Sequence, residues 1–167
     1  VGDLRNPADL ATLFSGRRID LVLHFAALSL VGESMQEPAR YYANNVAGSL
    51  NLLDAMRAAG VQRLVFSSTS AVYGVPQRLP LDEQHPLAPI NPYGPSKRKL
   101  EELLADHATA YSLRSVALRY FNAAGADPEA GLGERHAPET HLIPLVLQRA
   151  AQLRKGCTDS PPLQIFG

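Results

Sequence analysis

Apolar positions along the chain follow two different periods, and the two periods alternate from one end to the other. Three short apolar runs predict strands that are buried on both faces of a sheet, and these runs span residues 19–27, 62–68 and 114–121. Between the runs, apolar residues recur every three or four positions, which is typical of helices that bury one face. Strands that alternate with helices predict an α/β protein built on a doubly wound parallel sheet.

The first predicted helix has clear start signals. Asn6 can cap it with its side-chain oxygen. Pro7 suits its first position, because the N–H groups of the first turn have no intrahelical partner. Leu10, Leu13 and Phe14 then recur at helical spacing, so we expect all three to face the core.

Three further helices are predicted over residues 40–59, 92–111 and 142–153. The second of the four helices ends at Gly60, a residue type that commonly closes helices. Its inward stripe is expected to consist of Val46, Leu50, Leu53 and Met56. Polar, proline-containing or glycine-containing sequence predicts loops at residues 29–38, 75–92 and 122–140.

The third helix opens with Tyr93 and Lys97, four residues apart in the stretch NPYGPSK. This spacing places the two side chains on one face, one turn apart. An ammonium group beside a phenol favours phenolate, so we expect Lys97 to lower the pKa of Tyr93 from about 10. The same spacing also occurs on ordinary solvated helix faces, so the motif by itself is weak.

Distinctive residues cluster where the predicted strands end, namely Asp3, residues 25–27, residues 67–69 and residues 121–122. In parallel α/β sheets, ligands bind beyond the carboxyl ends of the strands. The pattern therefore predicts a ligand cleft at that edge of the sheet.

Composition narrows the function classes. Of the 167 residues 46% are hydrophobic and 19% charged, which suits a globular protein. The 16 basic residues balance the 16 acidic residues, so neither nucleic acid nor membrane is an expected partner. The single cysteine, Cys157, excludes an internal disulfide and is typical of a reducing compartment, so we expect a cytoplasmic protein. No apolar run is long enough to span a membrane.

Ordered motifs extend along the whole chain: GDLRN (2–6), HFAAL (24–28), VGES (31–34), YYANNVAG (41–48), VFSSTSAVYG (65–74), NPYGPSK (91–97), LRYFNAAGA (118–126), HLIP (141–144) and IFG (165–167). In order and spacing they resemble the extended short-chain dehydrogenase/reductase superfamily, and within it the UDP-glucose 4-epimerases of the NAD-dependent epimerase/dehydratase family. The resemblance implies a Rossmann-like fold and bound NAD.

The resemblance also implies how the chain is organised. Residues 1–125 correspond to a partial NAD-binding domain without its first βαβ unit, and residues 126–167 to the start of a mixed substrate-binding region. The glycine-rich loop that cradles the cofactor pyrophosphate in this superfamily has no counterpart here. Because the chain starts at Val1 and stops after IFG, we interpret it as an internal piece of a longer protein.

By resemblance, three residues carry the catalysis. Tyr93 is the expected acid/base, Lys97 holds the nicotinamide ribose and lowers the pKa of Tyr93, and Thr69 hydrogen-bonds the reacting oxygen. The neighbouring Ser70 is a weaker candidate, because it would point to the other face of a continuing strand.

The resemblance also assigns binding residues. The expected cofactor contacts are Asp3, Leu4, Phe25, Ala26, Ala27, Ser29, Asn44, Thr69, Tyr93, Lys97 and Phe121. The expected contacts of a UDP-sugar substrate are Thr69, Tyr93, Asn122, His141, Leu142, Gln164 and Phe166. Ser29 departs from the lysine of some epimerases, so it cannot form an ion pair with the cofactor. His141 stands where some members have an amide.

No metal site is predicted, because the histidines do not follow spacings such as HxxxH or HxxEH. His24 lies in an apolar run, and we interpret it as a core residue whose hydrogen bonds are satisfied rather than as a catalyst.

The implied reaction is reversible C4 epimerisation of UDP-galactose and UDP-glucose through a 4-keto sugar. Related dehydratases resemble one another in an Asp-Glu pair after the catalytic Ser/Thr, whereas Ser70 and Ala71 follow Thr69 here. Two alternatives stay open: a 4-epimerase for another UDP sugar, such as a pentose, uronic acid or N-acetylhexosamine, and a non-catalytic dinucleotide-binding module.

Family members commonly form homodimers through two long helices, so the helices at residues 40–59 and 92–111 are the expected contact with a second copy. Without a phosphate-binding loop, the isolated segment is expected to be inactive.

Overall fold

The computed structural model describes residues 1–156 of the chain. It divides into two compact units, one formed by Val1–Phe121 and one that begins at Asn122. Among residues 1–156, no helix is both long and apolar enough to cross a membrane.

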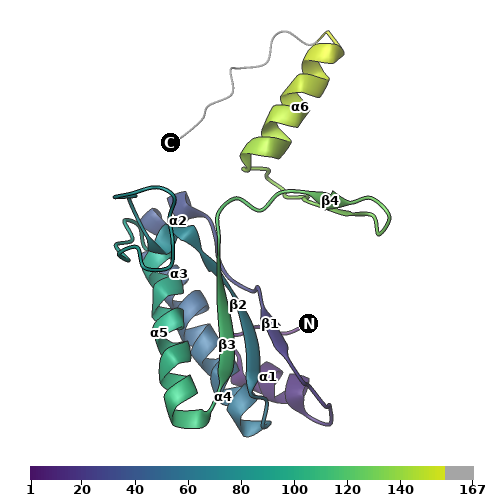
Figure 1. Ribbon diagram of the computed structural model, residues 1–167. Helices are drawn as coiled ribbons and strands as arrows, with labels where there is room; N and C mark the ends of the chain where they lie inside the picture. The colour runs from purple at the N-terminus through teal and green to yellow at the C-terminus, as the bar shows by residue number, and fades with distance from the viewer. Residues whose placement is uncertain (157–167) are drawn as a thin grey trace. The chain divides into compact units, whose positions relative to one another are not determined.

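The first unit is built on a parallel sheet of β1 (Val22–His24), β2 (Arg63–Thr69) and β3 (Arg114–Tyr120), in that spatial order. All strands run in the same direction, so their carboxyl ends lie at one edge (Figure 1). The register pairs Thr69 with Tyr120 at the end of β2 and β3. The prediction of a Rossmann-like parallel α/β fold is therefore confirmed.

Helical segments precede β1 and connect the strands. They are α1 (Pro7–Phe14), α2 (Val31–Gln36), α3 (Pro38–Tyr41), the π-helix η1 (Tyr42–Ala47), α4 (Gly48–Ala58), the 3-10 helix η2 (Ser70–Val72) and α5 (Tyr93–Tyr111). Asn6 caps α1 as predicted, by accepting a hydrogen bond from the backbone N–H of Ala8 at 3.1 Å. The loop predicted at residues 29–38 is wrong, because α2 and the start of α3 occupy most of it.

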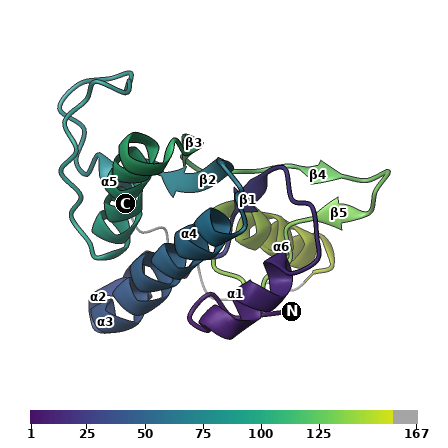
Figure 2. The ribbon, with the colours of Figure 1, turned by 90° about the horizontal axis from the view of Figure 1, so that it is seen from below.

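A single hydrophobic core joins α1, α4 and α5 to one face of the sheet (Figures 1 and 2). Right-handed crossovers that advance in one direction place their helices on one side, which accounts for this arrangement. The buried residues of the core are Leu10, Phe14, Leu52, Leu53, Met56, Val61, Leu64, Phe66, Leu100, Leu104 and Leu113.

The opposite face of the sheet carries no helix of the first unit, so the prediction that all strands are buried on both faces is wrong. Leu23 of β1 is 58% exposed and Val116 of β3 is 55% exposed. Both side chains alternate with residues that face the helices. The predicted inward stripes also contain errors, because Leu13 and Leu50 point to solvent.

The second unit contains a short antiparallel pair, β4 (Ala126–Asp127) and β5 (Leu132–Gly133), followed by α6 (Leu142–Arg154). The helix predicted at residues 142–153 is confirmed, and the hairpin lies in a stretch predicted as loop. The motif at residues 164–167 lies outside the described residues.

A matched pair of leucines on α1 tests the position of the core. Leu10 is 4% exposed and Leu13 is 44% exposed, on the same helix. Leu10→Ala should lower the free energy of unfolding by about 2–4 kcal/mol, because it leaves a cavity. Leu13→Ala should cost less than about 1 kcal/mol. Urea unfolding measures both, and equal losses would contradict the described packing of α1.

Candidate functional site

The carboxyl end of β2 and the amino end of α5 bring Thr69, Tyr93 and Lys97 together. Thr69 is the last residue of β2 and only 9% exposed, and its hydroxyl oxygen accepts a hydrogen bond from the backbone N–H of Ala71 at 3.1 Å. The Thr69 hydroxyl lies near enough to the phenol of Tyr93 to offset part of the rise in the Tyr93 pKa that burial causes. The predicted catalytic threonine and tyrosine are therefore direct neighbours.

Gly94 permits this close approach. A Cβ atom at Gly94 would lie 2.7 Å from the carbonyl oxygen of Ala71 and 2.6 Å from Cβ of Pro89, so no larger residue fits without movement of the backbone. Asn91 fixes the same turn, because its side-chain oxygen accepts the N–H of Gly94 at 3.1 Å. The local sequence thus sets Tyr93 against the turn that follows Thr69.

Lys97 is a buried cation. Its side chain is 4% exposed, and its Nζ donates a hydrogen bond to the carbonyl oxygen of Ser67 at 2.8 Å. Nζ also lies 4.9 Å from the centre of the Phe66 ring. Burial lowers the pKa of Lys97 to about 8, because the charged form loses its hydration. No carboxylate forms an ion pair with Lys97 within residues 1–156.

His24 lies beside this cation and is a core residue, as predicted. It is 4% exposed, its Nε2 is 2.8 Å from Oγ of Ser49, and its ring stacks on Phe66. Burial, together with the charge of Lys97, lowers the pKa of His24 to about 4. The imidazole is therefore neutral at physiological pH.

The predicted direction of the Tyr93 pKa is wrong for this structure. Burial raises the pKa of Tyr93, and the nearby Thr69 hydroxyl offsets only part of that effect. The Nζ atom of Lys97 lies 5.8 Å from the centre of the Tyr93 ring and points its hydrogen bond at Ser67. Desolvation of the phenol is therefore the largest cause of the shift.

Asn45 was missed by the sequence analysis, which chose Asn44. Asn45 is 2% exposed on the π-helix η1, and its side chain exchanges hydrogen bonds of 2.9 Å with the backbone N–H and C=O of Leu28. It also donates to Oγ of Ser96 on α5 at 3.1 Å. The partly buried Asn44 only donates to the side chain of Asn45. π-Helical turns concentrate at functional sites, and Asn45 ties the loop after β1 to the start of α5.

A second polar network, which the sequence analysis did not predict, lies between α5 and the sheet. Glu101, one turn after Lys97 on α5, forms an ion pair with Arg119 of β3 at 2.7 Å, with the side chains 13% and 20% exposed. Glu101 also accepts a hydrogen bond from Oγ of Ser68 at 2.5 Å. Arg119 donates to the hydroxyl of Tyr73 at 3.0 Å, and its pKa is raised by these partners. The network joins α5 to the ends of β2 and β3.

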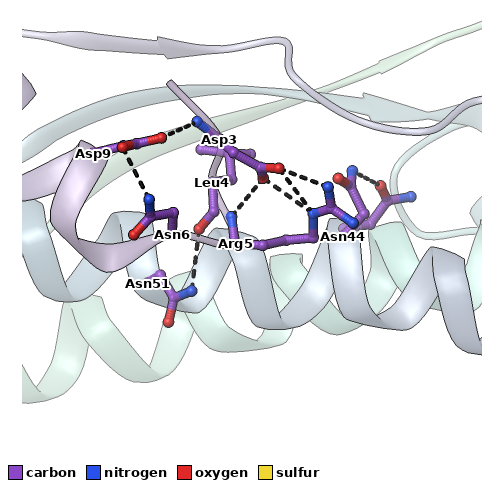
Figure 3. A network of polar contacts seen from close by, with 8 residues as sticks. Asp3, Leu4, Arg5, Asn6, Asp9, Asn44 and Asn51 are labelled. Carbon is purple, nitrogen blue, oxygen red and sulfur yellow. Dashed lines mark hydrogen bonds and ion pairs between the residues drawn. The ribbon is translucent and has the colours of Figure 1, made fainter. Parts of the chain in front are cut away.

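Asp3 and Leu4, the expected contacts of the adenine end, lie at the start of the chain. The carboxylate of Asp3 is paired with Arg5 at 2.6 Å, and these contacts lower the pKa of Asp3 to about 2 (Figure 3). The carbonyl of Leu4 accepts a hydrogen bond from Asn51 of α4 at 3.1 Å. Asp3 is partly exposed on the same polar segment.

The remaining expected cofactor residues of the first unit follow strand ends. Phe25 and Ala26 are exposed just after β1, Ala27 is half-buried and Ser29 is exposed. Phe121 follows β3 and is 65% exposed. Their place at the carboxyl edge agrees with the expected ligand cleft, whose existence stays a prediction.

Other expected substrate residues belong to the second unit. Asn122 is its first residue, while His141 and Leu142 stand at the start of α6. Gln164 and Phe166 lie outside the described residues.

An apolar hollow lies at the other end of the first unit, lined by Met56, Val61, His107, Tyr111 and Leu113, and it contains no predicted site residue.

Comparisons with known proteins agree with the motif pattern. The model of the NAD dependent epimerase/dehydratase family matches residues 1–167. A UDP-glucose 4-epimerase of Rhizobium leguminosarum bv. trifolii is 54% identical over 155 residues, which are 93% of this chain and 47% of that protein. The chain spans about half the length of the curated relatives it matches.

Solved structures agree as well. The UDP-glucose 4-epimerase of Brucella ovis in complex with NAD superposes with a TM-score of 0.87 at 52% identity, over 91% of this chain and 47% of that one. The UDP-glucose-4-epimerase of Stenotrophomonas maltophila, with bound NAD and formylated UDP-arabinopyranose, gives a TM-score of 0.84 at 45% identity, over 91% and 46%.

Lys97→Met tests the cost of the buried charge. A lysine whose pKa falls from 10.5 to about 8 on folding destabilises the folded protein at any pH where the lysine is charged in both the folded and the unfolded state. The cost is fully present below pH 8 and disappears as the pH rises toward 10.5. Lys97→Met should therefore raise the free energy of unfolding by on the order of 2 kcal/mol at pH 7, and by much less at pH 10.5. Urea unfolding at both pH values measures this, with the exposed Lys99→Met as control. A destabilised Lys97→Met protein at pH 7 would refute the proposed cost.

Two adjacent glutamates of α5 test the polar network between α5 and the sheet. Glu101→Gln should lower the free energy of unfolding by about 3 kcal/mol, because Arg119 keeps a largely buried charge without its partner. Glu102 pairs with Lys99 at the surface, with both side chains about half exposed, so Glu102→Gln should cost less than about 1 kcal/mol. Chemical denaturation of both variants measures the two losses in free energy of unfolding. Similar losses would mean that the Glu101–Arg119 pair behaves like a surface pair.

Proposed function

Because the chain belongs to the NAD dependent epimerase/dehydratase family, we propose that the whole protein is an NAD-dependent sugar-nucleotide 4-epimerase that interconverts UDP-galactose and UDP-glucose. The observation that carries the proposal is the grouping of Thr69, Tyr93 and Lys97 at the carboxyl edge of the sheet. Relatives named as UDP-glucose 4-epimerases at about half identity support the same reaction.

The residues at this edge fit NAD. Lys97 carries three N–H donors, and its described hydrogen bond to Ser67 uses one of them. A ribose that offers hydroxyl oxygens supplies acceptors for the others, which compensates the buried charge. When bound, NAD supplies the hydride acceptor and donor at the sugar C4. Asp3 is proposed to meet the adenosine end, while Phe25, Ala26, Ala27, Ser29, Asn44 and Phe121 line the remaining path.

The side chains then handle one proton. Tyr93 as phenolate takes the proton of the sugar 4-hydroxyl while C4 loses hydride, and it returns the proton after the 4-keto sugar has turned. The Thr69 hydroxyl can accept a hydrogen bond from the sugar 4-hydroxyl or donate one to the 4-keto oxygen. It can therefore bind the sugar both as alcohol and as ketone. The high pKa of Tyr93 in this structure must fall for this step, and a positive charge beside the phenol has that effect.

The sequence after Thr69 separates epimerisation from dehydration. Elimination of water needs further acid/base groups, and Ser70 and Ala71 provide no carboxylate there. A second candidate function is 4-epimerisation of another UDP sugar, favoured by the formylated UDP-arabinopyranose held in the Stenotrophomonas enzyme. A non-catalytic dinucleotide-binding module is less well supported, because binding alone does not require Tyr93.

The substrate is proposed to meet Asn122, His141 and Leu142, and, beyond the described residues, Gln164 and Phe166. A homodimer is proposed through the helices at residues 40–59 and 92–111. On the first of them, Tyr42 and Leu50 present apolar surface to solvent, with exposures of 41% and 39%.

Tyr93→Phe tests the acid/base role in the full-length protein. The variant should fold and retain NAD, while kcat for UDP-galactose falls by about 10²–10⁴-fold, because the proton acceptor is gone. A coupled assay of UDP-glucose formation measures kcat, and circular dichroism and NAD content check the fold. Tyr111→Phe, at the far end of α5 and 48% exposed, is the matched control and should keep normal turnover. Near-normal turnover of Tyr93→Phe would exclude Tyr93 as the acid/base.

A further inference from the structure

The segment between β5 and α6 groups four side chains that can ligate a metal. Nδ1 of His136, Nδ1 of His141 and carboxylate oxygens of Glu134 and Glu139 all lie within 4.8 Å of one another. All four belong to eight consecutive residues of the second unit, so the cluster does not depend on how the two units are placed.

The distances within the cluster suit a small cation. Nδ1 of His136 lies 3.5 Å from Oε1 of Glu134 and 3.8 Å from Oε1 of Glu139, and Nδ1 of His141 is in direct contact with Glu134. Two ligands of a tetrahedral Zn²⁺ with bonds of about 2.0–2.2 Å lie roughly 3.4 Å apart. The contact between His141 and Glu134 is shorter than this spacing, so these two atoms would have to move apart, and His136 and Glu139 to approach slightly, for all four to share one ion.

The orientation of the ligands is fixed by further contacts. The carboxylate of Glu139 accepts hydrogen bonds from the backbone N–H groups of Thr140 and His141, both at 2.9 Å, and its side chain is 10% exposed. The imidazole rings of His136 and His141 meet edge to face, with their centres 4.7 Å apart. Hydrogen-bonded carboxylates and oriented imidazoles are typical of the supporting contacts around metal ligands.

Charge and ligand type indicate which metal fits. Two carboxylates and two neutral imidazoles carry two negative charges, which one divalent cation balances. Imidazole nitrogen favours zinc and its transition-metal neighbours, whereas magnesium and calcium take oxygen ligands. Four protein ligands complete a tetrahedron, which is typical of a structural site rather than of a catalytic one.

We propose that Glu134, His136, Glu139 and His141 form a four-coordinate structural site for one Zn²⁺ ion, which fastens the β4–β5 hairpin to the start of α6. The site departs from the sequence prediction of no metal, because that prediction considered helical histidine spacings, whereas His136 and His141 are five residues apart in a loop. Nε2 of His141 is not part of this ligand set. His141 is also a proposed contact of the UDP-sugar substrate; zinc would hold its Nδ1 atom, and Nε2 would stay available to that substrate.

The test measures zinc and not turnover. Full-length protein is stripped with a chelator and titrated with Zn²⁺ by calorimetry, and elemental analysis counts the bound ions. We expect one Zn²⁺ per chain, and a tetrahedral Co²⁺ absorption spectrum after cobalt substitution. Glu134→Gln, which keeps the side-chain shape, and His136→Ala should each weaken Zn²⁺ binding by roughly 10-fold or more. Circular dichroism verifies that each variant is folded.

Matched controls separate this site from other zinc ligands. Glu129→Gln in the same unit and His107→Ala on α5 should leave Zn²⁺ affinity unchanged. Cys157→Ser tests a contribution from the thiol. The proposal is overturned if wild-type protein binds no Zn²⁺, or if binding survives Glu134→Gln and His136→Ala but is lost in Cys157→Ser. Equal occupancy by Mg²⁺ at the same concentration would also overturn it.

Discussion

The burial of the Lys97 ammonium group is the constraint on which the site depends. A charge in this position has lost its hydration shell. Among the described residues, Nζ donates one hydrogen bond to the carbonyl of Ser67 and lies over the face of the Phe66 ring. Burial, together with this charge, lowers the pKa of the neighbouring His24 to about 4. A cation that is buried with so few partners is costly for folding, and such groups are concentrated at functional sites.

Two polar networks hold the surrounding segments against this cation. Asn45 connects the loop after β1 to α5 through Leu28 and Ser96. Glu101 and Arg119 connect α5 to β2 and β3. Through these networks, the helix that carries Tyr93 and Lys97 is connected to the loop after β1 and to the ends of β2 and β3. Groups fixed in this way need little reorganisation when a proton moves.

The uncovered face of the sheet follows from topology. The order β1-β2-β3 advances in one direction, so the connecting helices gather on one side, and a doubly wound sheet needs a reversal of direction to cover the other. The apolar side chains of Leu23 and Val116 are therefore exposed in the first unit, although the sequence of each strand is that of a buried one.

Local signals in the sequence determined much of the first unit. The Asn6–Pro7 start of α1, the helix after Asn91 and the three parallel strands follow from capping, proline geometry and apolar runs, which act over a few residues. The spacing of Tyr93 and Lys97 likewise determined that they share a helix face, and the ordered motifs identified Thr69 as their partner.

Tertiary structure decided the rest, because those features depend on residues far apart in the chain. The pairing of Glu101 with Arg119 and the contacts of Asn45 with Leu28 and Ser96 arise only when strands and helices meet. The helices α2 and α3 in the predicted loop are stabilised by Tyr41, which is fully buried and donates a hydrogen bond to the carbonyl of Leu30. The raised pKa of Tyr93 also belongs to the fold: the sequence determined that a lysine lies one turn away, but only packing decided how little water reaches the phenol.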